Sequence, residues 1–336
     1  MTAYISRRLL LAFFTVWIIS IAAFVIIELP PGDTIDRLFD RTTRTHGEGI
    51  AIEMLAELRL RLGLDKPKHI RYGKWMWALL QGDLGQSMVP YGGLGNQRPV
   101  KEIIGDRLWT TVVFTGFTVL VTWSFAIPVG IYSAVRQHSV GDYVFTFIGF
   151  TGLAVPDFLL GLVLMYIAFA YFDQSVGGLF SSEFLDAPWS VARARDMLNH
   201  LWIPAIVLGT SGTAGLIRVL RNNLLDELSK PYVVTARAKG VASWKLIIKY
   251  PVRVAINPLI STVGYLLPSL VGGSVIVSVV LSLPTLGPVL LAAIQEEDTY
   301  TAGPIILMLG TLTVIGTLVS DILLAVVDPR IRYTSG

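Results

Sequence analysis

Long apolar runs that are nearly free of charge alternate with polar segments along the whole 336-residue sequence. A helix needs about 20 apolar residues to cross a hydrocarbon core of about 30 Å. Strands are a poor alternative, because the runs lack the two-residue alternation of a membrane barrel. The pattern therefore predicts an all-α polytopic membrane protein with six transmembrane helices, at Leu9–Leu29, Leu108–Val135, Tyr143–Phe172, Leu201–Ile217, Ile256–Leu283 and Ala302–Val327.

Composition supports this class and narrows the chemistry. Only 15% of the residues are charged, against about 25% in an ordinary soluble domain. A formal net charge of +3 gives no general basic surface for nucleic acid, and the lack of cysteine excludes disulfides, thiolate metal sites and cysteine nucleophiles. The four histidines show no metal-ligand spacing and fall in polar segments, so we expect them at the surface: His46, His69, His138 and His200.

The first apolar run follows Arg7 and Arg8, as a signal peptide would. It is longer than the apolar region of such a peptide, which has about 7–15 residues, and no A-x-A cleavage site follows it. We therefore expect a retained membrane anchor.

Basic residues in the short loops predict the orientation. They occur at both ends of the chain, after the second span at Arg136, and above all between the fourth and fifth spans. The loop between the fifth and sixth spans has no basic residue and carries Glu296, Glu297 and Asp298. Positive loops stay in the cytoplasm, so both termini are expected there, whereas the long segment Pro30–Arg107 can be translocated despite its charges.

The segment Pro30–Arg107 is too long and too patterned for a simple linker. It predicts a small extracytoplasmic helical cap with helices over Ile50–Gly63 and Ile70–Leu80 and a glycine-rich loop over Gly82–Asn96. Two tryptophans, Trp75 and Trp77, lie in the second helix. They are suited either to anchoring the cap at the membrane interface or to direct contact with a partner.

The cytoplasmic segment Leu220–Asn257 predicts two short helices with a glycine corner. A helix over Tyr232–Lys239 ends at Gly240, which can adopt positive φ. Ser243 is placed to cap a second helix over Trp244–Tyr250, which a proline closes. Such a pair makes a rigid knob at the membrane surface. The alternative is a basic interfacial helix that lies on anionic lipid.

At this segment the chain resembles a known family, the inner-membrane permease subunits of ATP-binding-cassette importers for dipeptides and oligopeptides. Residues 232–240, YVVTARAKG, are similar to the family's version of the importer loop motif. The general importer pattern begins with Glu-Ala-Ala, and here Val234 stands where the glutamate would be. The pattern's closing Ile-x-Leu-Pro is absent as well, and YPVR follows instead. The Thr-Ala-Arg-Ala-Lys-Gly form indicates the peptide-type subfamily.

An ordered series of short motifs extends the resemblance over nearly the whole chain: Pro31-Gly32-Asp33, Leu62-Gly63-Leu64-Asp65-Lys66-Pro67, Tyr72-x-x-Trp75, Gly82-Asp83-Leu84-Gly85-x-Ser87, Leu283-Pro284-x-Leu286-Gly287 and Asp328-Pro329-Arg330-Ile331-Arg332-Tyr333. The chain is similar to the member of the permease pair that has the large outer segment. The resemblance implies a type I importer permease fold with an N-terminal helix over 1–29, the cap over 30–107, and a permease core over 108–336 that contains the coupling loop 220–257.

The resemblance also implies function and partners. The chain would be half of a peptide-translocating pore in a bacterial inner membrane, not an enzyme and without a cofactor of its own. Its partners would be a second homologous permease, two ATPase subunits that bind ATP and magnesium, an extracytoplasmic binding protein and membrane lipids. Relatives with this architecture carry peptides, nickel complexes or sugars, so nickel complexes and oligosaccharides stay open as alternative substrates. Contact with the binding protein is assigned to Trp75, Trp77 and Asp83, and coupling to the ATPases to Thr235, Ala236, Arg237, Ala238, Lys239, Gly240, Ser243 and Trp244.

Sequence motifs also indicate whether this chain could supply the energy for transport by itself. A phosphate-binding G-x-x-x-x-G-K-[ST] loop is absent, and the glycine-rich stretch Gly209–Gly215 lies within a span, where small residues favour close helix packing. A secondary transporter would need a coupling acid and usually inverted repeats, and no repeat is visible. An intramembrane enzyme would need a clustered nucleophile and base or a metal set, and the spans lack histidine, lysine and arginine.

Apart from Glu28, at the end of the first span, two acids lie within the predicted spans. Asp157 follows Pro156 in the third span and is suited either to facing the pore or to binding the backbone freed by the proline. Asp321, in the sixth span, is expected to pair with a basic residue.

Overall fold

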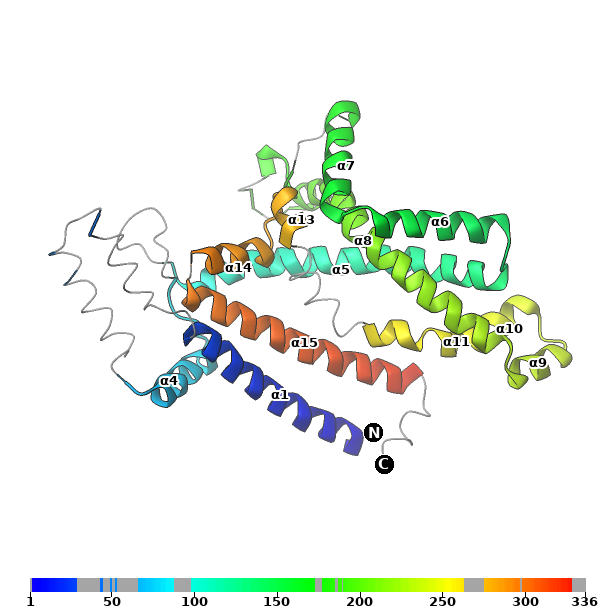
Figure 1. Cartoon of the computed structure of the whole chain (residues 1–336), viewed down its shortest axis with the longest axis horizontal. Helices are drawn as coiled ribbons and strands as arrows, with labels where there is room; N and C mark the ends of the chain where they lie inside the picture. Colours follow the sequence, from blue (N-terminus) through cyan, green and yellow to red (C-terminus); the bar gives the residue numbers. More distant parts are fainter. Residues whose placement is uncertain are drawn as a thin grey trace. The chain divides into compact units, whose positions relative to one another are not determined.

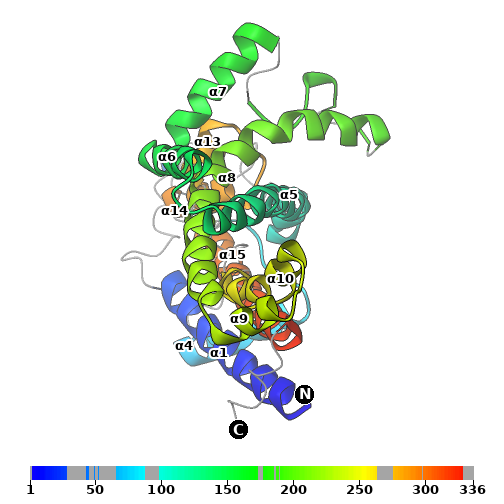
Figure 2. The ribbon, with the colours of Figure 1, turned by 90° about the vertical axis from the view of Figure 1, so that its right-hand side faces the viewer.

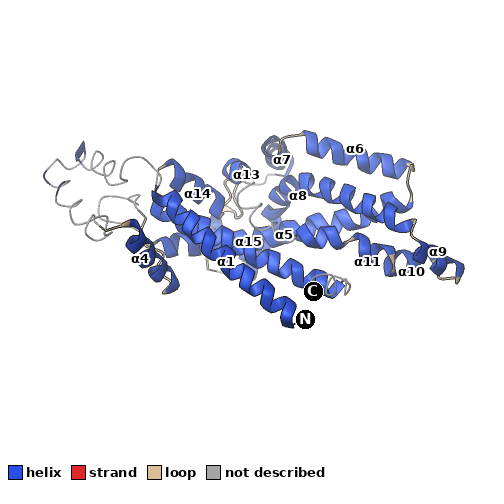
Figure 3. Ribbon diagram, turned by 60° about the horizontal axis from the view of Figure 1, so that its bottom comes forward, coloured by secondary structure: helices blue, strands red, loops and turns tan. Residues whose placement is uncertain are grey.

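The computed structural model describes residues 2–28, 43–44, 49, 52, 66–87, 98–172, 177–184, 187–188, 190–262, 275–296 and 298–327. Over these residues the regular structure is helical (Figure 3). The described β pairing is an isolated bridge between Gln86 and Pro99. The all-α class predicted from the sequence is therefore confirmed.

Three helices are long and apolar enough to cross a membrane: α1 (Thr2–Glu28), α5 (Val100–Val135) and α15 (Thr299–Val327). Two further candidates are bent, namely α8 (Val191–Leu228), with a 48° bend, and the pair α6 (Val140–Ala154) and α7 (Asp157–Phe172). The described residues thus hold up to five spans. The middle of the predicted fifth span, residues 263–274, lies outside the described part of the chain.

The third predicted span is not one straight helix. Its two halves, α6 and α7, meet at 102°, and Figure 1 shows this sharp corner. Val155 is extended, with φ −85° and ψ 126°, because the residue before a proline is disfavoured in helical conformation. The carbonyl of Pro156 then accepts from the amides of Leu159 and Leu160 at 2.9 and 3.1 Å and starts the new helix. The proline break was predicted, but its size was not.

The chain forms two compact units. The first comprises Met1–Leu10, Thr110–Thr285 and Thr313–Gly336. In it, α6 and α7 pack on α8, and α7 also contacts α13 (Val275–Val280). Two of its buried apolar clusters centre on α8, with Leu201 and Val207 in one and Leu220 and Leu224 in the other. Small residues allow close packing here, since a Cβ added to Gly209 would lie 3.2 Å from Oγ1 of Thr122.

The second unit comprises Leu11–Trp109 and Leu286–Leu312. It holds α4 (Lys68–Leu80) and α14 (Leu286–Gln295) beside parts of α1, α5 and α15. Within it α1 and α15 approach closely, because a Cβ added to Gly310 would lie 2.6 Å from Cγ2 of Ile19. The predicted cap helix over Ile70–Leu80 is confirmed as α4. The other predicted cap helix, Ile50–Gly63, lies almost wholly outside the described residues, as does Met88–Asn96 of the glycine-rich loop.

Candidate functional site

Two short helices, α9 (Pro231–Ala238) and α10 (Ser243–Lys249), follow α8 and form a knob (Figure 2). We use "knob" for residues 231–249. Gly240 has φ +77° and makes the corner between the helices. The amide of Gly240 donates to the carbonyl of Arg237 at 3.0 Å, and that of Val241 donates to the carbonyl of Ala236 at 3.4 Å. These two bonds form a Schellman motif, as predicted for a glycine just past a helix end.

The knob has its own small core. Val233 and Leu246 are 0% and 2% exposed, and Ala236 is buried with them. Val241, two residues past the end of α9, packs against the same core and so completes the apolar contact that accompanies a Schellman motif. Ala236 therefore stabilises the knob from inside and contributes no side chain to its surface.

The outer surface of the knob combines apolar and basic side chains. Trp244, Val234 and Ile248 are 69%, 57% and 58% exposed. Basic side chains are exposed among them, including Arg237 and Lys239. Of the other predicted coupling residues, Thr235, Ala238, Gly240 and Ser243 are also exposed. This mixture of a large aromatic, aliphatic side chains and cations suits a protein contact better than plain solvation.

Ser243 does not cap the second helix, contrary to the sequence prediction. The helix starts one residue earlier than expected, with Ala242 at the N-cap and no side-chain capping bond. The carbonyl of Ala242 accepts from the amide of Leu246 at 2.9 Å. The Schellman motif places Val241 in the core, which leaves Ala242 rather than Ser243 at the boundary.

A third short helix, α11 (Pro251–Ala255), connects the knob to the rest of the first unit. It packs on α8 and α10, and Ile247 of α10 touches both the knob core and the cluster around Leu220 and Leu224. Arg253 donates to the carbonyl of Val327 at 3.0 Å, and Ser320 donates to the carbonyl of Ile260 at 2.8 Å. The knob is thus packed, through α11 and Ile247, against α8.

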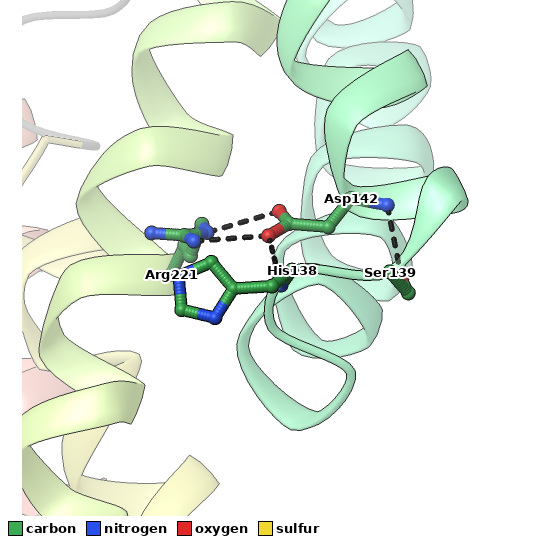
Figure 4. Close-up of polar contacts among 4 residues, drawn as sticks. All are labelled: His138, Ser139, Asp142 and Arg221. Carbon is green, nitrogen blue, oxygen red and sulfur yellow. Dashed lines mark hydrogen bonds and ion pairs between the residues drawn. The ribbon is translucent and has the colours of Figure 1, made fainter.

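A buried ion pair holds the connection between α5 and α6 against α8, and the sequence reasoning missed it. Arg221 donates from Nε and Nη2 to the two carboxylate oxygens of Asp142 at 3.1 and 3.0 Å (Figure 4). The amide of His138 also donates to Asp142, at 3.0 Å, and the amide of Asp142 donates to Ser139, the N-cap of α6, at 3.2 Å. Asp142 lies in the first turn of α6 and is 2% exposed. The available signal was that Asp142 is the one acid between the second and third predicted spans, beside the basic Arg136.

Side chains of α4 anchor it on the end of α1. Tyr72 lies 2.8 Å from Ser20 between hydroxyl oxygens, and Arg71 pairs with Glu28 at 2.6 Å. Trp75 stacks against Phe24 with ring centroids 5.7 Å apart. By contrast, Trp77 is 64% exposed. The two tryptophans, which the sequence treated alike, therefore have different environments, and only Trp77 offers a large free surface.

The loop after α4 turns back through Asp83 and is fixed by a buried acid. Oδ1 of Asp83 accepts from the amide of Gly85 at 2.9 Å. Two residues later, Ser87 donates to Asp298 at 2.6 Å, and Asp298, 2% exposed, also accepts from the Thr301 hydroxyl at 2.7 Å. The sequence placed Asp298 in an acidic outer loop, but this carboxylate is a structural centre that joins residues far apart in the chain.

Comparison with known proteins decides the family. Residues 126–333 match the family described as "Binding-protein-dependent transport system inner membrane component", and residues 1–115 match its N-terminal region. The chain belongs to this family. It is 35% identical to the oligopeptide transport system permease protein AppB of Bacillus subtilis, over 99% of this chain and all of that one. It is 30% identical to the dipeptide transport system permease protein DppB of Escherichia coli K12, over 99% of each chain, and 32% identical to the glutathione transport system permease protein GsiC of Salmonella choleraesuis, over 99% of this chain and all of that one.

The family assignment makes this chain a permease component of a transport system in the inner membrane. The knob lies inside the matched permease region, residues 126–333. Its residues were selected from the sequence, and the structure brings them together in one compact feature, with Ala236 in its core and the others at its surface. The proposed contact residues of the outer segment, Trp75, Trp77 and Asp83, lie in the matched N-terminal region.

The two acids of the predicted spans have different surroundings. Asp321 pairs with Arg8 at 2.8 Å, which confirms the expected basic partner. Asp157 begins α7, in its first turn. A carboxylate there is favoured by the helix dipole, which adds a structural reason for an acid after Pro156.

One histidine differs from its prediction. His200 is not at the surface: it is 8% exposed, and its Nδ1 lies 2.8 Å from the carbonyl of Asp196. It sits within α8, which starts ten residues earlier than the predicted span and carries this polar end into the packed unit. His69 and His138 are exposed as expected, and His46 lies outside the described residues. Within the described part of the permease, no group of three or more metal-binding side chains occurs.

Proposed function

We propose that this permease forms half of the pore of an ATP-driven importer for dipeptides or oligopeptides. The relatives named for oligopeptide, dipeptide and glutathione transport match it over its full length. These names favour peptides over the nickel complexes and oligosaccharides that the sequence left open. The second pore half would be a homologous permease, and the substrate would arrive on an extracytoplasmic binding protein.

The observation that carries the ATP-driven mechanism is the knob. Its Schellman corner fixes the angle between α9 and α10, and its exposed tryptophan and cations suit docking on another protein. The packing of α10 and α11 on α8 provides a rigid route from the docked surface to the spans. Movement of two ATPase subunits, which would bind ATP and magnesium, would then shift the spans as packed bodies between two states. The permease itself contributes no catalytic group or cofactor.

The proposal also places each segment of the chain on one side of the membrane. The basic knob and both termini lie in the cytoplasm, and residues 30–107 form the outer cap between the N-terminal helix and the core over 108–336. On the cap, the exposed Trp77 and the turn at Asp83 form the contact with the binding protein, while Trp75 holds α4 in place.

The experiment that tests the proposal separates ATP-driven import from secondary transport. The permease is reconstituted in vesicles with its second permease and ATPases, and uptake of a radiolabelled dipeptide and a pentapeptide is measured with the binding protein outside. Uptake should require ATP on the knob side and survive collapse of the proton and sodium gradients. Uptake that follows either gradient without ATP would show a secondary transporter, and ATP-dependent uptake of nickel complexes or sugars with no peptide uptake would refute the substrate class.

A further inference from the structure

A cavity of about 320 Å³ lies between α6 and α8, beside the connection that the Asp142–Arg221 pair holds. This volume is at the lower end for small-ligand sites. Its polar lining includes His138, Arg218 and Asn222, and its apolar lining includes Phe145, Phe150 and Ile217. We call it the α6–α8 cavity. A polar end beside an apolar wall is suited to an amphipathic ligand.

Arg218 gives this cavity its charge. Its guanidinium carbon lies 4.7 Å from the centre of the Phe150 ring. Among the residues that the structure describes, no carboxylate lies within ion-pair distance of it. The acid that lines the cavity, Asp142, is already engaged through both oxygens by Arg221. The charged side chains that line the cavity are therefore one ion pair, whose charges cancel, and the additional cation Arg218.

The position of Arg218 on the helices indicates the kind of anion. Phe150 lies two turns along α6 from Asp142, within the predicted third span, so the guanidinium is drawn towards the apolar zone. A cation in the apolar zone is stabilised most by an anion that is itself anchored in the membrane. Phe147 and Phe150 of α6 are 72% and 55% exposed and offer an apolar surface along which a hydrocarbon chain can lie.

We propose that the α6–α8 cavity binds the headgroup of an anionic phospholipid, with Arg218 on the phosphate and an acyl chain along the exposed aromatic face of α6. Basic pockets between spans on the cytoplasmic side are a general way to bind such headgroups. The bound headgroup neutralises the charge of Arg218 and fills the cavity between α6 and α8. The proposal is independent of which substrate the permease moves.

The test measures lipid retained by the purified full-length chain. The chain is placed in bilayers of phosphatidylcholine with increasing phosphatidylglycerol, extracted, and its bound phosphatidylglycerol is counted by native mass spectrometry. Arg218→Gln should weaken retention roughly fivefold, which corresponds to about 1 kcal/mol for one cation on an anionic lipid. Arg218→Lys should keep most of the retention, and so should the control Arg136→Gln, which removes an exposed charge outside the cavity lining.

A second variant tests the cavity rather than the charge. Thr146→Trp would fill the space from α6 and should lower retention while Arg218 stays in place. Equal retention by wild type, Arg218→Gln and Thr146→Trp would overturn the proposal. Two further results would also overturn it: displacement of the lipid by inorganic phosphate, which would show a site for soluble anions, and loss of the lipid when the second permease assembles, which would show a subunit interface.

Discussion

Replacing Gly240 by valine should disconnect the knob from the ATPases without unfolding the membrane part. The glycine sits at φ +77°, where a residue with a Cβ costs about 1–2 kcal/mol, and a β-branched residue lies at the upper end. No atom lies within 4 Å of the position a Cβ would take, so the whole cost comes from the backbone. That cost lowers the population of the native corner about five- to thirtyfold. Since Val241 follows directly, it would also leave the knob core.

The assay is made on the reconstituted transporter. Gly240→Val should leave the permease inserted in the membrane, but it should lower the amount of ATPase that co-purifies or leave ATP hydrolysis unresponsive to the loaded binding protein. Gly240→Asn should retain most of both properties, because asparagine tolerates the left-handed conformation. Gly215→Ala is the matched control, since that glycine lies inside α8 with open space around it and needs no positive φ.

The result that would refute this reasoning is a Gly240→Val complex with normal ATPase stoichiometry and normal stimulated hydrolysis. The knob would then be better explained as a basic helix pair resting on the lipid surface. A variant that fails to insert would contradict the claim that the spans do not depend on this corner.

Three further predictions concern orientation, the acid after the kink and the buried ion pair. Ser243→Cys should react with a membrane-impermeant thiol reagent only in opened cells, whereas Lys68→Cys on the outer segment should react in intact cells; the reverse pattern would invert the topology. Asp157→Asn should reduce peptide transport but preserve assembly and basal ATP hydrolysis if the carboxylate faces the substrate; normal transport by Asp157→Asn together with failed assembly of Asp157→Leu would make the residue structural. Asp142→Asn should destabilise the purified chain by about 2–3 kcal/mol, near the lower limit for a buried pair, because the Arg221 side chain keeps 23% exposure. A thermal-unfolding double-mutant cycle with Arg221→Gln measures this coupling, and additive effects of the two changes would contradict it.

Local chemistry made the knob predictable. A glycine just past a basic last turn, followed by a short apolar stretch and a proline, determines a turn within about ten residues. The error at Ser243 has the same origin: a serine is a good N-cap, but the packing of Val241 moved the helix boundary by one residue. Likewise, Pro156 predicted a break, whereas the size of the break depends on how α6 and α7 each pack on α8.

The interactions that the sequence did not reveal join distant residues. Asp142 meets Arg221 across 79 positions, and no spacing rule connects an acid in one loop with an arginine two spans later. His200 showed a similar limit: its polar neighbours suggested a surface position, while its burial depends on where the connection before α8 folds back. Such contacts are set by the tertiary arrangement, and a single sequence records only their separate members.

The hydrogen bond between Ser87 and Asp298 has a consequence for biogenesis. It joins positions 211 residues apart, and a chain made from its N-terminus reaches Ser87 long before Asp298. During most of synthesis the loop at Ser87 therefore lacks Asp298. In that time the contacts available near it are those made earlier in the chain, such as the ring contacts of Phe24 with Tyr72 and Trp75. Asp298 and Thr301, at the start of α15, are then made within three residues of each other and complete this set of hydrogen bonds. A chain whose synthesis stops before residue 298 would therefore lack the bond that joins the loop at Ser87 to the start of α15.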